Sequence, residues 1–250
     1  MYFLLSGEGP GDIGVCNPSA DRCDRAGFSE GPMAIIIDQM IEAFQRFDMS
    51  HLDTGRVSYV SEGYLSEHKL PPRKKAMSLK GKKKPAETKY YFENARSLAA
   101  AAKAKSDEIG DSVVAVLFRD ADGTASAGRG NWSDKRNSII EGFRAEAFEF
   151  GVPMVPKPKS EAWLLCATKK NPYQHCAALE NESGNDDSGR VPLKDQLSDS
   201  LDGNSGTGHI NQRVIARTID FHQIDMPSFN TFKEDLERAV NLAVASRMII

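Results

Sequence analysis

Two aspartates stand one residue apart at the end of a predicted strand. Asp120 and Asp122 follow the apolar run Val113–Phe118, and Gly123 comes next. A run of this kind, rich in β-branched residues, is typical of a strand that is buried on both faces of a parallel sheet. Ligands of open α/β sheets bind beyond the carboxyl ends of the strands, so these carboxylates would form a hard oxygen site suited to Mg²⁺ or Mn²⁺. The alternative is a simple strand exit, because Asp favours turns and Gly accepts positive φ.

A third acidic residue, Glu8, follows the first predicted strand. The apolar run Tyr2–Leu5 is too short for a helix, and it leads into the glycine-rich stretch Ser6-Gly7-Glu8-Gly9-Pro10-Gly11-Asp12. A phosphate-binding loop would be followed at once by a helix, whereas here a polar segment, residues 15–32, comes next. We therefore interpret Glu8 as a candidate metal ligand, with a plain glycine-rich turn as the alternative.

A fourth carboxylate, Glu161, is expected in the first turn of a helix that follows the predicted strand Val152–Val155. A glutamate in a first helical turn is explained by the helix dipole alone. This helix nevertheless begins where another parallel strand ends, which would bring Glu161 to the same edge as the other acids. Several carboxylates at one edge cannot all stay ionised without cations, and divalent ions can stabilise the attacking and leaving oxygens of a phosphoryl displacement. The catalytic candidates are Glu8, Asp120, Asp122 and Glu161, of which the first three are the candidate metal ligands.

The elements that must position these side chains alternate between strand and helix. This order predicts an α/β fold with a mostly parallel, Rossmann-like sheet flanked by helices and followed by a C-terminal helical extension. A length of 250 residues allows one large α/β domain, or one domain with a small appendage. We place the α/β core at 1–170 and a helical extension, packed on that core, at 171–250. Helices are expected at 33–47, 90–105, 133–150 with Ser133 as its cap, 193–201, 209–221, and after Ser228 as a cap.

A basic segment at 69–89 predicts a contact with nucleic acid. The whole chain carries a net charge of −3, so this segment is a local positive arm on an otherwise acidic protein. Its prolines and lysines keep it solvated, which also suits a merely solubilising loop. A contact with the phosphate backbone needs such an arm, and its binding should weaken steeply with salt. The candidate contacts are Lys74, Lys75, Lys82, Lys83 and Lys84, together with Lys157 and Lys159 in the loop before Glu161.

The composition excludes several other classes. A chain with 40% hydrophobic and 27% charged residues is typical of soluble globular proteins. No apolar run approaches the roughly 20 residues of a membrane span, and the opening lacks the features of a signal peptide, so we expect a cytoplasmic location. Cys16, Cys23, Cys166 and Cys176 form no Cys-x-x-Cys pair. This spacing argues against a zinc ribbon or a disulfide scaffold and favours reduced thiols.

The chain resembles the Toprim domain of topoisomerases, bacterial primases and OLD-type nucleases. The resemblance rests on Glu8-Gly9-Pro10-Gly11-Asp12 after a first strand and on Asp120-Ala121-Asp122 after a later one. Lys159-Ser160-Glu161-Ala162-Trp163-Leu164-Leu165 and Pro227-Ser228-Phe229-Asn230-Thr231-Phe232 are similar to small stand-alone Toprim-like proteins found near bacterial anti-phage and mobile-element genes.

The resemblance implies a Toprim-like core and a Mg²⁺-dependent nuclease that acts on DNA or RNA in an anti-phage context, with a partner ATPase as a further candidate. It assigns Glu8 and Asp120 as metal ligands, Asp122 as a ligand or its neighbour, and Glu161 as an accessory acid. No tyrosine can be assigned as a topoisomerase nucleophile, so the resemblance implies cleavage by water. The gap between Glu8 and Asp120 is longer than in a minimal Toprim core.

Two other functions use the same residues. Asp120-Ala121-Asp122-Gly123-Thr124 also resembles the first motif of haloacid-dehalogenase-type phosphatases, in which Asp120 would be the nucleophile and Asp122 the acid or base. That motif normally stands near the start of its domain, whereas here it is in mid-chain. The third interpretation is a non-catalytic protein that binds nucleic acid or serves as a partner subunit.

Overall fold

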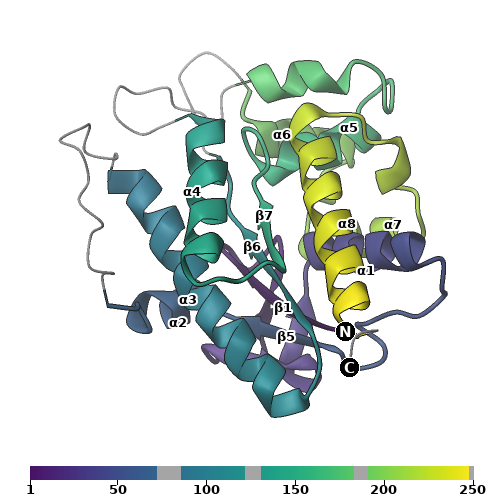
Figure 1. Ribbon diagram of the computed structural model, residues 1–250. Coiled ribbons are helices and arrows are strands. Elements are labelled where there is room, and N and C mark those ends of the chain that lie inside the picture. The colour runs from purple at the N-terminus through teal and green to yellow at the C-terminus, as the bar shows by residue number, and fades with distance from the viewer. Residues whose placement is uncertain (72–85, 122–130, 183–190, 248–250) are drawn as a thin grey trace.

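The computed structural model describes residues 1–71, 86–121, 131–182 and 191–247 of the chain (Figure 1). A central sheet has the strand order β3-β5-β1-β6-β7, in which β1, β5, β6 and β7 run parallel and β3 pairs antiparallel at one edge. The strands of this sheet are β1 (Tyr2–Gly7), β3 (Arg22–Asp24), β5 (Val57–Val60), β6 (Val113–Phe118) and β7 (Gly151–Met154). The predicted α/β fold with a mostly parallel sheet flanked by helices is confirmed.

Helices cover both faces of the sheet (Figure 1). The α-helices are α1 (Pro32–Gln45), α2 (Glu62–Glu67), α3 (Ala86–Ile109), α4 (Trp132–Ala145), α5 (Ser160–Thr168), α6 (Leu193–Ser200), α7 (Thr207–Ile215) and α8 (Pro227–Arg247). Short 3-10 helices are η1 (Arg25–Gly27), η2 (Cys176–Asn181) and η3 (Phe221–Gln223). The segment predicted only as a polar insert contains β2 (Gly14–Cys16) and β4 (Phe28–Glu30), which form a small antiparallel sheet, and β3, which joins the main sheet.

Alternate side chains of β1 and β6 enter two separate hydrophobic clusters. Leu4 and Leu117 belong to the cluster that includes residues of α3 and α4, whereas Leu5 and Phe118 belong to the cluster that includes residues of α1, α5 and α8. All side chains of β6 are buried. The continuous apolar run of this strand therefore reflects burial on both faces, as predicted for a central parallel strand.

The C-terminal helices pack on the sheet through α8. The indole N–H of Trp163 in α5 donates to the Ser228 hydroxyl at 2.9 Å, and the rings of Phe229 and Phe232 lie 4.9 and 5.8 Å from that indole. Because α8 begins at Pro227, Ser228 lies inside this helix and is not the helix cap that the sequence predicted. One hydrophobic cluster contains residues from both sides of the predicted boundary at 170, which stays a prediction.

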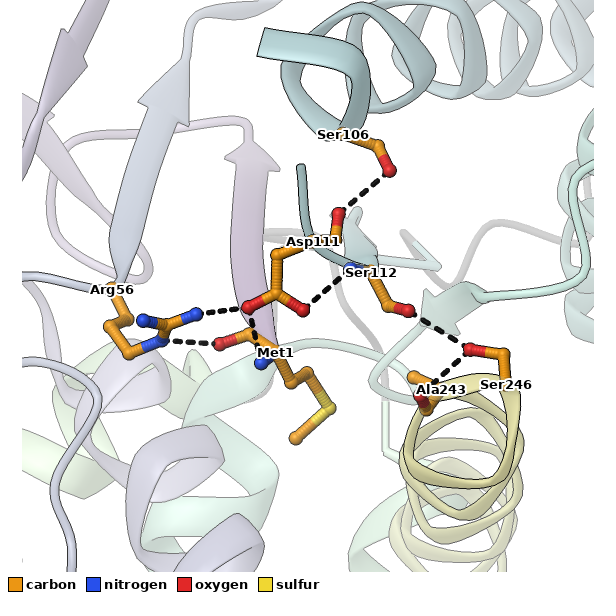
Figure 2. A network of polar contacts seen from close by, with 7 residues as sticks. All are labelled: Met1, Arg56, Ser106, Asp111, Ser112, Ala243 and Ser246. Atoms are coloured by element: carbon orange, nitrogen blue, oxygen red, sulfur yellow. Dashed lines mark hydrogen bonds and ion pairs between the residues drawn. The ribbon is translucent and has the colours of Figure 1, made fainter. Parts of the chain in front are cut away.

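A polar network joins the amino ends of β1, β5 and β6 (Figure 2), whereas Glu8 follows the carboxyl end of β1. The Asp111 carboxylate accepts from the Met1 ammonium at 2.8 Å and pairs with the Arg56 guanidinium, which also donates to the Met1 carbonyl at 2.7 Å. The Ser112 hydroxyl lies 2.9 Å from that of Ser246 in α8. These contacts fix β1, β5 and β6 relative to each other and to the C-terminal helix.

The cap of α4 differs from the prediction. Asn131, not Ser133, is the N-cap, and it exchanges side-chain and backbone hydrogen bonds with Asp134 in a capping box. The helix ends at Ala145 and does not reach Phe150, because the chain turns through Ala147 at positive φ and the Phe150 carbonyl accepts from Ala115 of the sheet.

All four cysteines are paired, which makes the expectation of reduced thiols wrong. Cys16 bonds to Cys23 and Cys166 to Cys176. The second pair is possible because the chain turns back after α5, where the Tyr173 N–H donates to the Cys166 carbonyl at 2.7 Å. Disulfides are typical of oxidising compartments, so the cysteines give no support to the cytoplasmic location, which stays a prediction. In the described part of the chain, no helix is both long and apolar enough to cross a bilayer.

Candidate active site

The strand order reverses at β1, and this reversal places the carboxyl ends of β1 and β6 next to each other. From β1 the chain moves outward to β5 and then returns past β1 to form β6 and β7. In doubly wound sheets ligands bind at such a switch point, beyond the carboxyl ends of the strands. Glu8 directly follows β1 and Asp120 lies two residues beyond β6. The fold therefore brings two of the predicted site residues to the position at which it is best suited to bind a ligand.

Glu8 and Asp120 are in direct contact. The Asp120 backbone N–H donates to Oε1 of Glu8 at 2.7 Å. The Oδ1 atom of Asp120 in turn accepts from the backbone N–H of Ser160, the first residue of α5, at 3.0 Å. This donor is one of the amides at a helix N-terminus that have no partner within the helix, and the helix dipole favours negative charge there. The loop after β6 is thus held between β1 and the start of α5.

Asp12 is a site residue that the sequence analysis did not select. Its Oδ1 atom accepts from the hydroxyl of Ser160, which is buried, and that hydroxyl also lies 3.5 Å from Oε2 of Glu161. Ser160 therefore links Asp12 to Asp120, with its hydroxyl on one and its amide on the other. We call Glu8, Asp12, Asp120 and Glu161 the acidic cluster.

The loop between Glu8 and Asp12 depends on two glycines. Gly9 has a φ of +75°, a conformation that residues with a side chain rarely adopt. Gly31, just before α1, approaches the Asp12 backbone so closely that a Cβ at this position would lie 2.2 Å from the Asp12 carbonyl oxygen. The Glu-x-x-x-Asp spacing with glycines at a strand end was the signal in the sequence for Asp12.

Burial and mutual repulsion raise the pKa values of two acids in this cluster. Burial is the main cause that raises the pKa of Asp12 to about 6; the Ser160 hydrogen bond opposes it, and the charges of Glu161 and Glu8 add to it. Burial also raises the pKa of Asp120 well above its usual range, followed by the charges of Asp12, Glu161 and Glu8. The four carboxylates are therefore close enough to influence one another, although they come from distant parts of the chain.

Arg119 and buried side chains from the helices support the cluster. The Arg119 guanidinium pairs with Glu8 at 3.1 Å and with Glu62 of α2 at 2.6 Å. The Tyr91 hydroxyl donates to the Asp120 carbonyl at 2.9 Å, and the buried ammonium of Lys135 donates to the Ala121 carbonyl. These contacts hold the backbone on both sides of Asp120.

The other predicted site residues are placed as follows. Lys159 is partly buried before α5, and its charge lowers the pKa of Asp12, so it lies near the acidic cluster. Lys157 is partly buried in the same loop. Asp122 lies outside the described residues. The predicted nucleic-acid contacts of the basic segment also lie outside them, namely Lys74, Lys75, Lys82, Lys83 and Lys84.

The acidic cluster fits a hard divalent cation by its donor chemistry. Mg²⁺ and Mn²⁺ take carboxylate oxygens, and a dication would relieve the mutual repulsion that, after burial, raises the pKa values of Asp12 and Asp120. Among the described residues, however, no three Asp, Glu, His or Cys side chains lie together as a ready-made metal site. The cluster thus has the right ligands and charge without a complete coordination shell.

Comparison of the chain with protein-family models, with curated proteins and with solved structures finds no match.

Proposed function

We propose that the protein is a metal-dependent phosphodiester hydrolase that acts on DNA or RNA. The observation that carries this proposal is the contact between Glu8 and Asp120, together with the Ser160 bridge from Asp120 to Asp12. Acids separated by more than a hundred residues converge at the switch point of the sheet, and their charges disfavour one another. Such an arrangement is costly for a fold unless the acids bind a cation.

The residues that would hold Mg²⁺ or Mn²⁺ are Glu8, Asp12 and Asp120, with Asp122 as a further candidate. When bound, such an ion supplies charge stabilisation for the oxygens of a phosphoryl group under displacement. Glu161 follows Ser160 at the N-terminus of α5 and is the candidate acid or base for the attacking water. Its Oε2 atom lies 3.5 Å from the Ser160 hydroxyl, which also donates to Asp12.

The chain's own polar groups keep the acids in position. Ser160 fixes Asp12 and Asp120 with two donors from one residue, and the amide of Asp120 fixes Glu8. Lys159 directly precedes Ser160 in the sequence, and its charge acts on Asp12. Together with Lys157 it is suited to hold the phosphate backbone of a nucleic acid next to the acids.

Cleavage assays with the purified protein test the proposed function. Labelled single- and double-stranded DNA and RNA are incubated with Mn²⁺ or with EDTA, using wild type, Asp120→Asn and Asp12→Asn, with Glu67→Gln as a matched control for a lost surface carboxylate. We expect Mn²⁺-dependent cleavage that falls at least a hundredfold in the two site variants and is unchanged in the control.

Three results would contradict or redirect the proposal. Cleavage that persists in EDTA would contradict a metal-dependent mechanism. If a phosphomonoester releases phosphate and a phosphoryl group can be trapped on Asp120, the protein is a haloacid-dehalogenase-like phosphatase. Mn²⁺ binding without turnover of any substrate would identify a binding protein.

A further inference from the structure

Arg119 is a cation located at the border of the acidic cluster. It stands between the last residue of β6 and Asp120, and its guanidinium makes ion pairs with Glu8 and with Glu62. The two pairs use different nitrogens, Nη2 for Glu8 and Nη1 for Glu62. Because the guanidinium is planar and rigid, both carboxylates are fixed by a single group.

The position of this guanidinium is set by its surroundings. The side chain of Arg119 is 13% exposed, and its guanidinium carbon lies 4.6 Å from the centre of the Tyr90 ring. Nη1 also donates to the Tyr90 hydroxyl at 3.3 Å. Its Nε atom is buried and has no hydrogen-bond partner among the described residues. A side chain packed in this way has little freedom to move away from Glu8.

The two carboxylate oxygens of Glu8 have different partners. Oε1 accepts from the Asp120 backbone N–H, whereas Oε2 faces Arg119. The guanidinium therefore acts directly on Glu8, the residue whose other oxygen binds the Asp120 amide.

We propose that Arg119 is a positioning residue that holds Glu8 in place and lowers the affinity of the acidic cluster for a divalent cation. This inference rests on the proposed metal-dependent function. The positive charge of Arg119 offsets part of the negative charge that attracts the ion. The negative charge of Glu62 in turn offsets part of the positive charge of Arg119. Arg119 therefore keeps the cluster assembled without the metal and weakens metal binding.

The test measures Mn²⁺ binding by electron paramagnetic resonance of the free ion and thermal unfolding in EDTA. For Arg119→Gln we expect an affinity for Mn²⁺ about tenfold higher, the effect of one charge beside a partly solvated dication, together with a lower Tm. Arg119→Lys keeps the charge, so its Mn²⁺ affinity should stay within about twofold of wild type. If Arg119 has only a structural role, Arg119→Gln should have both a lower Tm and a lower Mn²⁺ affinity. The Mn²⁺ affinity of Arg119→Gln would then not exceed that of Arg119→Lys.

The outcomes distinguish this inference from the proposed function. Unchanged or weaker Mn²⁺ binding by folded Arg119→Gln would overturn the role of Arg119 alone. If that variant does not fold, Glu62→Gln gives the answer, because loss of the Glu62 charge should weaken Mn²⁺ binding severalfold, and unchanged binding would overturn the inference. Absence of Mn²⁺ binding by the wild-type protein would overturn the metal-dependent function, and the role of Arg119 with it.

Discussion

Replacement of Asp12 by Asn should stabilise the metal-free protein at neutral pH. Burial raises the pKa of Asp12 from its usual 3.8 to about 6. A folded-state pKa above the unfolded value means that the stability contribution is present at pH 4 and is lost as the pH rises to about 6. The shift corresponds to about 3 kcal/mol at 1.36 kcal/mol per unit, and partial solvent screening reduces it to about 2 kcal/mol. An Asn side chain avoids this loss and can still accept from Ser160.

In the wild-type protein, the titration of His51 changes the stability with pH in the opposite direction to that of Asp12. The two contributions must therefore be separated. Burial, with a further contribution from the charge of Arg56, lowers the pKa of His51 from 6.5 to about 4. Because the unfolded chain binds the proton more readily, stability from this residue is gained as the pH rises from about 4 to 6.5. The two effects have opposite signs over the same range, so the pH profile of the wild type alone is uninformative. The difference between Asp12→Asn and wild type removes the contribution of His51.

The assay is urea unfolding in EDTA at pH 4.5 and pH 7.5 for wild type, Asp12→Asn and the control Glu67→Gln. We expect Asp12→Asn to exceed wild type in free energy of unfolding by about 1 kcal/mol at pH 4.5, which already lies above the unfolded pKa, and by about 2 kcal/mol at pH 7.5. The control should show no such pH-dependent difference. A difference for Asp12→Asn that is the same at both pH values, or a loss of stability at pH 7.5, would refute the reasoning.

Three further predictions concern other parts of the molecule. Cys176→Ser should lower the free energy of unfolding by about 2.5 kcal/mol in urea titrations under oxidising conditions, because the lost cross-link spans a sequence separation of 10; an unchanged free energy of unfolding in the variant would contradict this. Trp163→Phe should lower the free energy of unfolding by about 2 kcal/mol, since it removes the hydrogen bond to Ser228 and buried volume. An unchanged Tm in thermal unfolding would instead indicate that α8 is loosely docked. Lys157→Ala with Lys159→Ala should reduce the slope of log affinity against log salt by about two in anisotropy titrations with duplex DNA, and an unchanged slope would exclude these lysines as phosphate contacts.

The fold and the convergence of the acids were largely predictable from the sequence. The apolar run of β6 is buried on both faces, and such a run indicates a central parallel strand. Once the strands are parallel, residues that follow them must gather at one edge, which brings Glu8 and Asp120 together. The alternation of strands and helices therefore carries the positional information for these two residues.

The remaining features depend on contacts that no local pattern reveals. Asp12 belongs to the site because the glycine loop folds back toward α5, where the Ser160 hydroxyl meets it. Arg119 is a single residue just after β6, and its role depends on an ion pair with Glu62 from α2. The disulfide of Cys166 depends on a turn after α5 whose geometry is set by tertiary packing.

The most direct test of the central claim is Mn²⁺ binding by wild type and by Asp120→Asn, measured from loss of the free-ion paramagnetic signal. The pKa of the partly buried Asp120 is raised by burial and then by all three of its partners in the acidic cluster, so its charge should matter most for the ion. We expect saturable binding by wild type and an affinity at least tenfold lower for Asp120→Asn, with Glu67→Gln unchanged. Equal Mn²⁺ affinity for wild type and Asp120→Asn would contradict this expectation.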